Sequence, residues 1–142
     1  FCCLFFACGG IRLVGIVIVS HSQKLAEGVA ELAGMMAKGV DIAAAGGLED
    51  GELGTSFARI EAGIESVNGE DGVVVLADMG SAFLTAELAA DAQAGGRVRL
   101  ANAPLVEGAV LAAVTAAGGA TLDEVFQKAE SAGCWDKRAL GA

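Results

Sequence analysis

The sequence contains a single histidine, His21, which lies directly after an apolar run and directly before a helical pattern. Asp78 follows a second apolar run much later in the chain. A carboxylate that accepts the Nδ1–H of an imidazole fixes its tautomer and leaves the Nε2 lone pair free. Such a pair can act as a general base, or as a nucleophile that carries a group on Nε2. The chemistry therefore depends on whether the fold brings His21 and Asp78 together.

Strands and helices alternate along the sequence. Four strands are predicted, over residues 13–19, 40–45, 72–77 and 97–101. The first and third are continuous apolar runs, typical of strands buried on both faces, and the short fourth strand alternates. Apolar residues at helical spacing predict helices between these strands and after the last one. This order predicts an α/β fold of three layers, in which helices cover both faces of a mostly parallel four-stranded sheet with the strand order 2-1-3-4.

Helix starts are predicted at residues whose side chains accept hydrogen bonds from free backbone amides. These N-caps are Ser22, Thr55 or Ser56, and Ser81, while Thr121 and Glu124 form a capping box. Large apolar residues at helical spacing predict the inner faces of the helices. In the first helix they are Leu25, Val29, Leu32 and Met36, and in the helix after Ser81 they are Phe83 or Leu84, with Leu88. Gly28, inside the first helix, is expected to permit close helix packing.

The predicted strand order places the first and third strands side by side. His21 follows the first strand and Asp78 the third, so both are expected at one edge of the sheet, where ligands usually bind. Two helices begin at this edge, and helix N-termini bind anions. These surroundings favour a nucleophilic His21 that carries a phosphoryl group. The residues expected to hold this group are Ser22, Gln23, Met79, Gly80 and Ser81.

Spacing alone leaves other interpretations of these residues open. A histidine at a strand end is also typical of a helix cap, and Asp78 is typical of a turn. A hydrolase is a further interpretation, with His21 as general base for a nearby serine such as Ser20. A regulatory module in which His21 is never phosphorylated is another. The sequence contains no Walker loop and no GxGxxG motif, so a nucleotide site is not predicted.

Composition and charge limit the class of protein. Hydrophobic residues make up 54% of the chain, which excludes a disordered chain. The net charge of −9 argues against nucleic acid and anionic membranes as partners, and it is compatible with a basic protein partner. The four cysteines (Cys2, Cys3, Cys8 and Cys134) do not form a zinc-binding pattern. We therefore expect no metal, no cofactor and a reducing, cytoplasmic compartment.

The two ends of the sequence differ from its middle. Residues 1–11 contain an apolar run without an initiator methionine or a basic segment before it, so we expect a non-native or leader segment. Residues 12–132 are expected to form one domain. Residues 133–142 lack helical periodicity and are expected to be a tail.

Four parts of the sequence resemble the mannose-type enzyme IIA domains of the bacterial phosphoenolpyruvate-dependent phosphotransferase system. They are residues 17–29, which contain VIVSHS and LAEGV, residues 60–66 (IEAGIES), residues 78–82 (DMGSA) and residues 103–108 (APLVEG). The resemblance covers about residues 13–132. It implies a flavodoxin-like fold, usually a homodimer, in which His21 is phosphorylated and Asp78 orients it. It also implies that Met79, Gly80 and Ser81 lie beside the phosphoryl group.

The resemblance implies partners as well. The donor in this family is the phosphorylated histidine-containing phosphocarrier protein. Sugar-transporting members often read NxPML where this sequence has NAPLV at residues 102–106, which favours the dihydroxyacetone kinase branch. In that branch the acceptor is ADP bound to the nucleotide-binding subunit of the kinase. A sugar-transport enzyme IIA with the same chemistry and another acceptor is the alternative.

Overall fold

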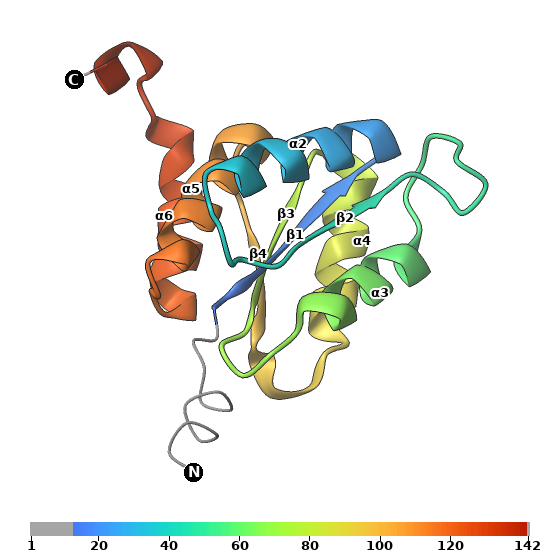
Figure 1. Cartoon of the computed structure of the whole chain (residues 1–142). Helices are drawn as coiled ribbons and strands as arrows, with labels where there is room; N and C mark the ends of the chain where they lie inside the picture. The colour runs from blue at the N-terminus through green and yellow to red at the C-terminus, as the bar shows by residue number, and fades with distance from the viewer. Residues whose placement is uncertain (1–12, 142) are drawn as a thin grey trace.

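Four parallel strands form one sheet at the centre of the computed structural model, which describes residues 13–141 (Figure 1). The strands are β1 (Gly15–Ser20), β2 (Ile42–Gly46), β3 (Val73–Ala77) and β4 (Val98–Ala101). Their order is β2-β1-β3-β4, and every neighbouring pair is parallel. The predicted fold class and strand order are therefore confirmed.

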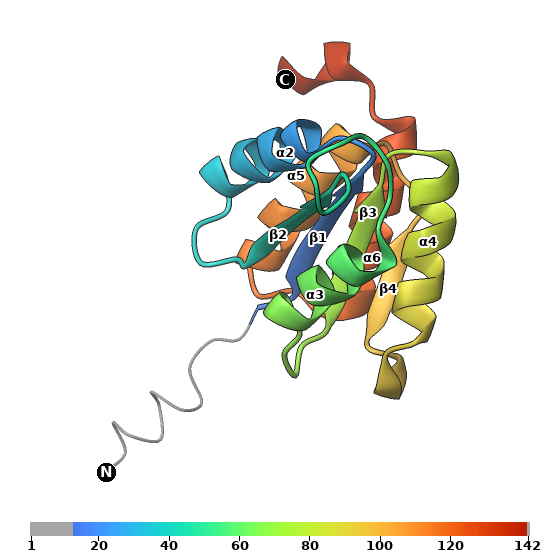
Figure 2. The same cartoon turned by 90° about the vertical axis from the view of Figure 1, so that its right-hand side faces the viewer.

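Five α-helices complete the three layers (Figure 1 and Figure 2). They are α2 (Gln23–Met35), α3 (Phe57–Val67), α4 (Gly80–Asp91), α5 (Leu105–Ala117) and α6 (Leu122–Ser131). Helices α2, α5 and α6 pack on one face of the sheet, and α3 and α4 pack on the other. Ser22, Ser56 and Thr121 accept hydrogen bonds as N-caps, and Thr121 forms the predicted capping box with Glu124.

The central strands β1 and β3 are buried on both faces, as their continuous apolar runs predict. The edge strands β2 and β4 are only partly buried. Side chains alternate between the two layers. Ile16, Ile18, Val74 and Leu76 pack toward α2, α5 and α6. Val17, Val19, Val73 and Val75 pack toward α3 and α4. All eight are fully buried, so the sheet is packed between two hydrophobic cores, one on each face.

Helices α2, α4 and α5 contact the sheet mainly through alanine, which corrects the inner faces predicted for α2 and α4. Helix α4 buries Ala82, Ala86, Ala89 and Ala90, whereas Leu84 and Leu88 are 63% and 64% exposed. Only Val29 of the stripe predicted in α2 is buried, and Leu25, Leu32 and Met36 are exposed. Under these helices the branched strand side chains fill much of the space, so close packing favours small side chains there. Helix α3 differs, since it buries Ile60 and Ile64.

Two predictions about helix starts and packing are also wrong. Ser81 is not an N-cap, because α4 begins at Gly80 and Met79 occupies the cap position. Gly28 permits no close contact, since a Cβ there would meet no atom within 4 Å. The close approach lies at Gly46, where a Cβ would stand 2.5 Å from the carbonyl oxygen of Ser22. Gly46 therefore allows the start of α2 to lie against the end of β2.

The expected leader, residues 1–11, lies outside the described residues together with Cys2, Cys3 and Cys8. The C-terminal segment forms two short 3-10 helices, Ala132–Cys134 and Lys137–Gly141, and extends away from the sheet (Figure 1). Lys137 Nζ lies 2.6 Å from Glu107 Oε2 and ties this segment to α5. None of the described helices has the length and apolar character needed to cross a membrane.

Candidate active site

The carboxyl ends of β1 and β3 lie side by side and carry His21 and Asp78. The two strands pair in register up to Val19 and Ala77, and the N–H of Asp78 donates to the carbonyl of Val19 at 3.0 Å. This pairing continues past the last residue of β3 and places Asp78 beside the start of the segment that holds His21. The predicted juxtaposition is therefore confirmed, and it follows from the strand order.

Asp78 holds the imidazole through a carboxylate that is itself fixed on both oxygens. Oδ1 lies 3.1 Å and Oδ2 3.3 Å from His21 Nδ1. Oδ2 accepts the N–H of His21 at 3.0 Å and the hydroxyl of Ser20 at 2.8 Å. Oδ1 accepts the N–H of Met79 at 2.6 Å. Because a carboxylate only accepts, the network assigns the ring proton to Nδ1.

The pKa of Asp78 is lowered from its ordinary value. Partial burial alone raises the pKa of this carboxyl, but the hydrogen bonds that it accepts outweigh burial. These bonds come from the backbone of His21, the hydroxyl of Ser20, the backbone of Met79 and the His21 ring. Asp78 is therefore ionised at neutral pH and can balance a positive charge on the imidazole.

The other ring nitrogen faces outward toward a hydroxyl. His21 Nε2 lies 2.9 Å from Ser81 Oγ, and with the proton on Nδ1 it accepts from that hydroxyl. Ser81 Oγ lies 3.4 Å from Thr55 Oγ1, which belongs to the loop between β2 and α3. The His21 side chain is 32% exposed, so a reactant can reach Nε2 once Ser81 rotates.

The residues predicted to hold phosphate all lie at this edge, but their polar groups differ in availability. Ser22 donates its N–H to Ser20 Oγ at 3.0 Å and accepts from Leu25 N–H at 3.2 Å. The N–H of Met79 is used by Asp78. The first-turn amides of Gln23 in α2 and of Gly80 and Ser81 in α4 have no acceptor among the described residues. Gly80 has a φ of 53°, which suits glycine and makes a sharp turn into α4.

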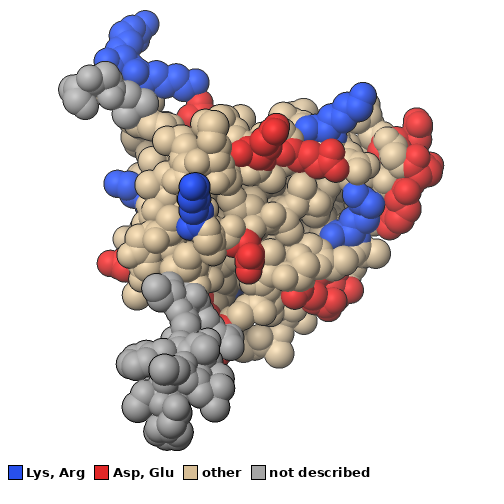
Figure 3. Space-filling view, in the orientation of Figure 1, with Lys and Arg blue, Asp and Glu red and all other residues tan. Residues whose placement is uncertain are grey.

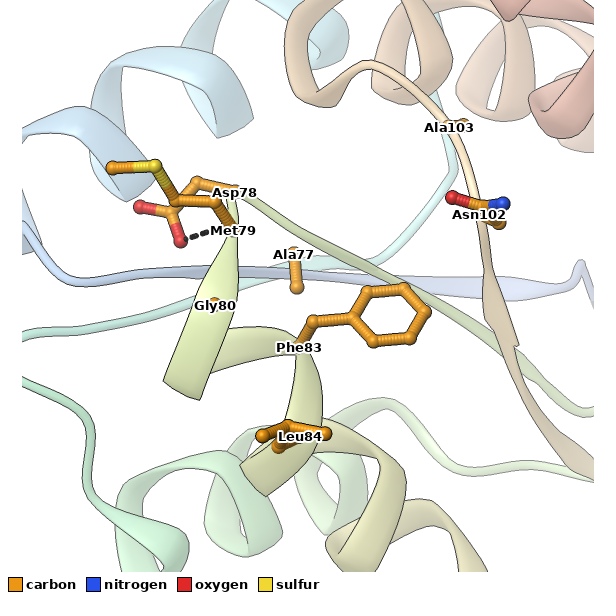
Figure 4. Close-up of a pocket in the computed structure, with 8 residues that line it drawn as sticks. All are labelled: Ala77, Asp78, Met79, Gly80, Phe83, Leu84, Asn102 and Ala103. Carbon is orange, nitrogen blue, oxygen red and sulfur yellow. Dashed lines mark hydrogen bonds between the residues drawn. The ribbon is translucent and has the colours of Figure 1, made fainter.

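Two pockets flank the histidine. The first has a volume of about 470 Å³ and lies between α4 and the end of β4 (Figure 4). It is lined by Ala77, Asp78, Met79, Gly80, Phe83, Leu84, Asn102 and Ala103. The second, about 430 Å³, is lined by Ser22, Gln23, Lys24, Glu27, Gly51 and Leu53. The described residues contain no group of three or more His, Cys, Asp or Glu side chains placed to hold a metal ion.

A family model described as the PTS system fructose IIA component (EIIA-man) matches residues 15–126 of the chain. The chain belongs to this IIA family. The match spans the sheet, α2 to α5 and the start of α6, and it includes both His21 and Asp78.

Curated relatives of this IIA chain share the same subunit name. One from Escherichia coli (strain K12), the phosphoryl donor subunit DhaM of PEP-dependent dihydroxyacetone kinase, is 46% identical over 121 residues. The match covers 80% of this chain and 26% of that relative, so the chain spans about a quarter of its length. One from Lactococcus lactis subsp. lactis (strain IL1403), the phosphotransferase subunit DhaM of PTS-dependent dihydroxyacetone kinase, is 39% identical over 116 residues, which are 82% of this chain and 93% of the relative.

Solved structures have the same fold as this IIA chain. A crystal structure of EF1359, a protein of unknown function, has a TM-score of 0.77 and 33% identity, over 87% of this chain and 99% of that chain. The mannose/sorbose-specific IIA subunit of the phosphotransferase system from Enterococcus faecalis has a TM-score of 0.59 and 21% identity, over 86% of this chain and 90% of that chain. The second likeness supports the fold alone.

The contacts of two residues of the site were not predicted from the sequence, which offered Ser20 only as a possible nucleophile. Ser20 contacts Asp78, and Thr55 contacts Ser81. A signal for Ser20 exists, since it is the only polar residue in the strand sequence GIVIVS. The place of Thr55 depends on the path of the loop after β2, for which the IIA sequence contains no local signal.

Proposed function

We propose that this IIA chain is a phosphoryl relay protein of a phosphotransferase system that serves dihydroxyacetone kinase. His21 takes a phosphoryl group from the phosphorylated histidine of a phosphocarrier protein. It then passes the group to ADP bound on the nucleotide-binding subunit of the kinase. The observation that carries the proposal is the 3.1 Å contact between His21 Nδ1 and the fixed carboxylate of Asp78, with Nε2 directed to the open edge.

In the first transfer, Nε2 of His21 attacks the phosphorus of the donor. The new Nε2–P bond forms as the donor N–P bond breaks, and the electron pair of the broken bond stays on the donor nitrogen. The His21 ring keeps its proton on Nδ1 and becomes positively charged, which the ionised Asp78 stabilises. Ser81 releases Nε2, and its hydroxyl and the free amides of Gln23 and Gly80 then hold phosphoryl oxygens.

The second transfer reverses these changes. A terminal phosphate oxygen of ADP attacks the phosphorus, and the Nε2–P bond breaks with its electron pair returning to Nε2. The ring is again neutral, so no proton has to leave Nδ1. Such in-line transfers depend mainly on position and electrostatics, which a rigid imidazole–carboxylate pair supplies.

The proposal extends to the setting of the protein. We place it in the cytoplasm as a homodimer with a role in glycerol metabolism, and we assign the domain to residues 12–132, as the family resemblance implies. The two relatives named DhaM support the choice of a kinase system over sugar transport.

Intact mass spectrometry tests this function. The protein is incubated with phosphoenolpyruvate, enzyme I and the phosphocarrier, and we expect the mass to rise by one phosphoryl group. His21→Ala is expected to gain none. Adding the kinase subunit loaded with ADP should remove the group from the wild type, whereas a sugar-transport acceptor should not. No gain of mass in the wild type would overturn the proposal.

A further inference from the structure

Ser20 is the one polar side chain that is buried within the described part of the chain, with 1% of its surface exposed. It is the last residue of β1 and precedes His21. Its hydroxyl donates to Asp78 Oδ2 at 2.8 Å and accepts the N–H of Ser22 at 3.0 Å. A hydroxyl with both a donor and an acceptor partner has a defined orientation.

These two bonds join three parts of the site. Ser20 belongs to β1, Asp78 follows β3, and Ser22 is the N-cap of α2. The Ser20 hydroxyl and the His21 N–H both approach Oδ2, which leaves Oδ1 as the nearer oxygen to Nδ1. Rotation of the carboxylate would break the bond to Ser20, so the hydroxyl opposes that rotation.

We propose that Ser20 is a positioning residue for phosphoryl transfer, whose hydroxyl holds the Asp78 carboxylate so that Oδ1 receives the Nδ1–H of His21 and Nε2 faces the incoming phosphorus. Ser20 is too deeply buried to touch the donor protein or the phosphoryl group. Its effect therefore passes through Asp78. That Ser20 acts in phosphoryl transfer rests on the proposed function. The hydrogen bond from Ser20 to Asp78 is independent of it.

The same hydroxyl also influences the pKa of Asp78. Burial raises the pKa of Asp78, and the bond from Ser20 is one of those that lower it. His21 is the only titratable side chain in the described residues that lies within hydrogen-bond distance of this carboxylate. Glu27 on α2 is bonded to Gln23, and Arg59 on α3 to the Gly46 carbonyl. Without the Ser20 hydroxyl, the carboxylate loses one of the bonds that hold Oδ2, so it is less firmly oriented and its pKa moves upward.

Ser20→Ala, Ser20→Thr and the control Ser66→Ala test the role of the hydroxyl. Ser66 is exposed, and its hydroxyl donates to the Gly63 carbonyl at the far end of α3. For Ser20→Ala we expect kcat for transfer from the phosphocarrier to fall about tenfold to a hundredfold, the scale on which small displacements of reacting groups act. The KM for the phosphocarrier should change little, and the acid limb of the pH profile should move to higher pH. Ser20→Thr should restore most of the rate, and Ser66→Ala should match the wild type.

Nitrogen NMR of the His21 ring gives a readout that requires no phosphate donor. We expect the wild type and Ser20→Thr to carry the proton on Nδ1, and Ser20→Ala to show a mixture of the two tautomers. The tautomer tests the role of Ser20 even if the wild type is never phosphorylated. Failure of the wild type to become phosphorylated would reject the proposed function and not the hydrogen-bond role of Ser20.

Three results would overturn the role of Ser20. The first is an Ser20→Ala protein with wild-type kcat and tautomer. The second is an Ser20→Thr protein as slow as Ser20→Ala, because the loss would then reflect packing. The third result concerns Ser20→Cys, which replaces Ser20→Ala if that protein does not fold. A thiol is a weaker hydrogen-bond donor than a hydroxyl and is similar in size, so we expect Ser20→Cys to be slower than the wild type. An equal rate would reject the proposal.

Discussion

At the residue scale, the two nitrogens of His21 have different surroundings. Nδ1 contacts a carboxylate that is fixed by Ser20, by Met79 and by the backbone of His21 itself. Among residues 13–141, the one hydrogen-bond partner of Nε2 is the hydroxyl of Ser81, which can rotate away. This asymmetry keeps the proton on the inner nitrogen and offers the outer one to a reactant. The proposed chemistry follows from that difference.

Replacing Asp78 by Asn tests the need for the negative charge. The amide is similar in size, but it neither fixes the Nδ1–H tautomer nor balances the charged ring. We expect the protein to fold and its transfer rate to fall by about a hundredfold or more, as for other histidines that lose an orienting carboxylate. Stopped-flow measurement of the transfer, with circular dichroism as the control for folding, checks this. A rate within a few-fold of the wild type would contradict the role of Asp78.

The same carboxylate makes stability depend on pH. Because the pKa of Asp78 is lower in the folded than in the unfolded protein, its ionised form favours folding. This contribution is complete above the unfolded pKa of about 4 and disappears as the pH falls through the folded pKa. Urea unfolding of the wild type and Asp78→Asn should show a stability difference that shrinks as the pH is lowered from about 5. A difference that grows on acidification would contradict the assigned direction of the shift.

At the scale of elements, the sequence was sufficient for the order of strands but not for the faces of the helices. The apolar strand runs and the parallel topology predicted that His21 and Asp78 meet. The inner face of α4 was predicted wrongly because periodicity favours large residues such as Leu84 and Leu88. Under α4 the side chains of the sheet fill the interior and favour alanines, whereas α3 on the same face buries Ile60 and Ile64. This choice depends on the distance between each helix and the sheet. Thr55 was missed for a similar reason, since a loop path and not a local pattern brings it to Ser81.

The contact between β2 and α2 gives a prediction at this scale. In Gly46→Ala, the new Cβ would lie 2.8 Å from the Cα of Gln23 and would push the start of α2 away from the sheet. We expect a loss of about 1–3 kcal/mol in the free energy of unfolding, and slower transfer because the amide of Gln23 moves. The control is Gly28→Ala in α2, where the methyl group meets open space and should raise the free energy of unfolding by up to about 1 kcal/mol. Urea unfolding and transfer rates that are equal for the two variants would contradict this account of α2.

At the scale of the whole molecule, the charge is strongly negative and unevenly placed. The net charge is −9. Figure 3 shows acidic side chains gathered at the end that carries the loop between β2 and α3. That loop contains the exposed residues Glu49, Asp50 and Glu52, and it also contributes Thr55 to the site. A basic partner would therefore be attracted to the edge where His21 lies.

Salt should reduce the rate at which the donor protein meets the site. The Debye length falls from about 30 Å at 0.01 M to about 10 Å at 0.1 M salt, and we expect the second-order rate constant to fall by about tenfold or more. Neutralising the loop through Glu49→Gln, Asp50→Asn and Glu52→Gln should lower the rate at low salt and flatten this dependence. Neutralising Asp41, Glu65 and Asp91, at the opposite edge, serves as the control and should have a smaller effect. A rate constant that does not change with salt would contradict electrostatic attraction at this edge.

Phosphorus–nitrogen NMR of the phosphorylated, nitrogen-15-labelled protein tests the central claim most directly. The protein is treated with phosphoenolpyruvate, enzyme I and the phosphocarrier, and the scalar coupling from phosphorus to the His21 ring is measured. We predict a one-bond coupling to Nε2, with the proton retained on Nδ1 beside Asp78. A coupling to Nδ1, or a phosphoryl group on any other residue, would contradict the account.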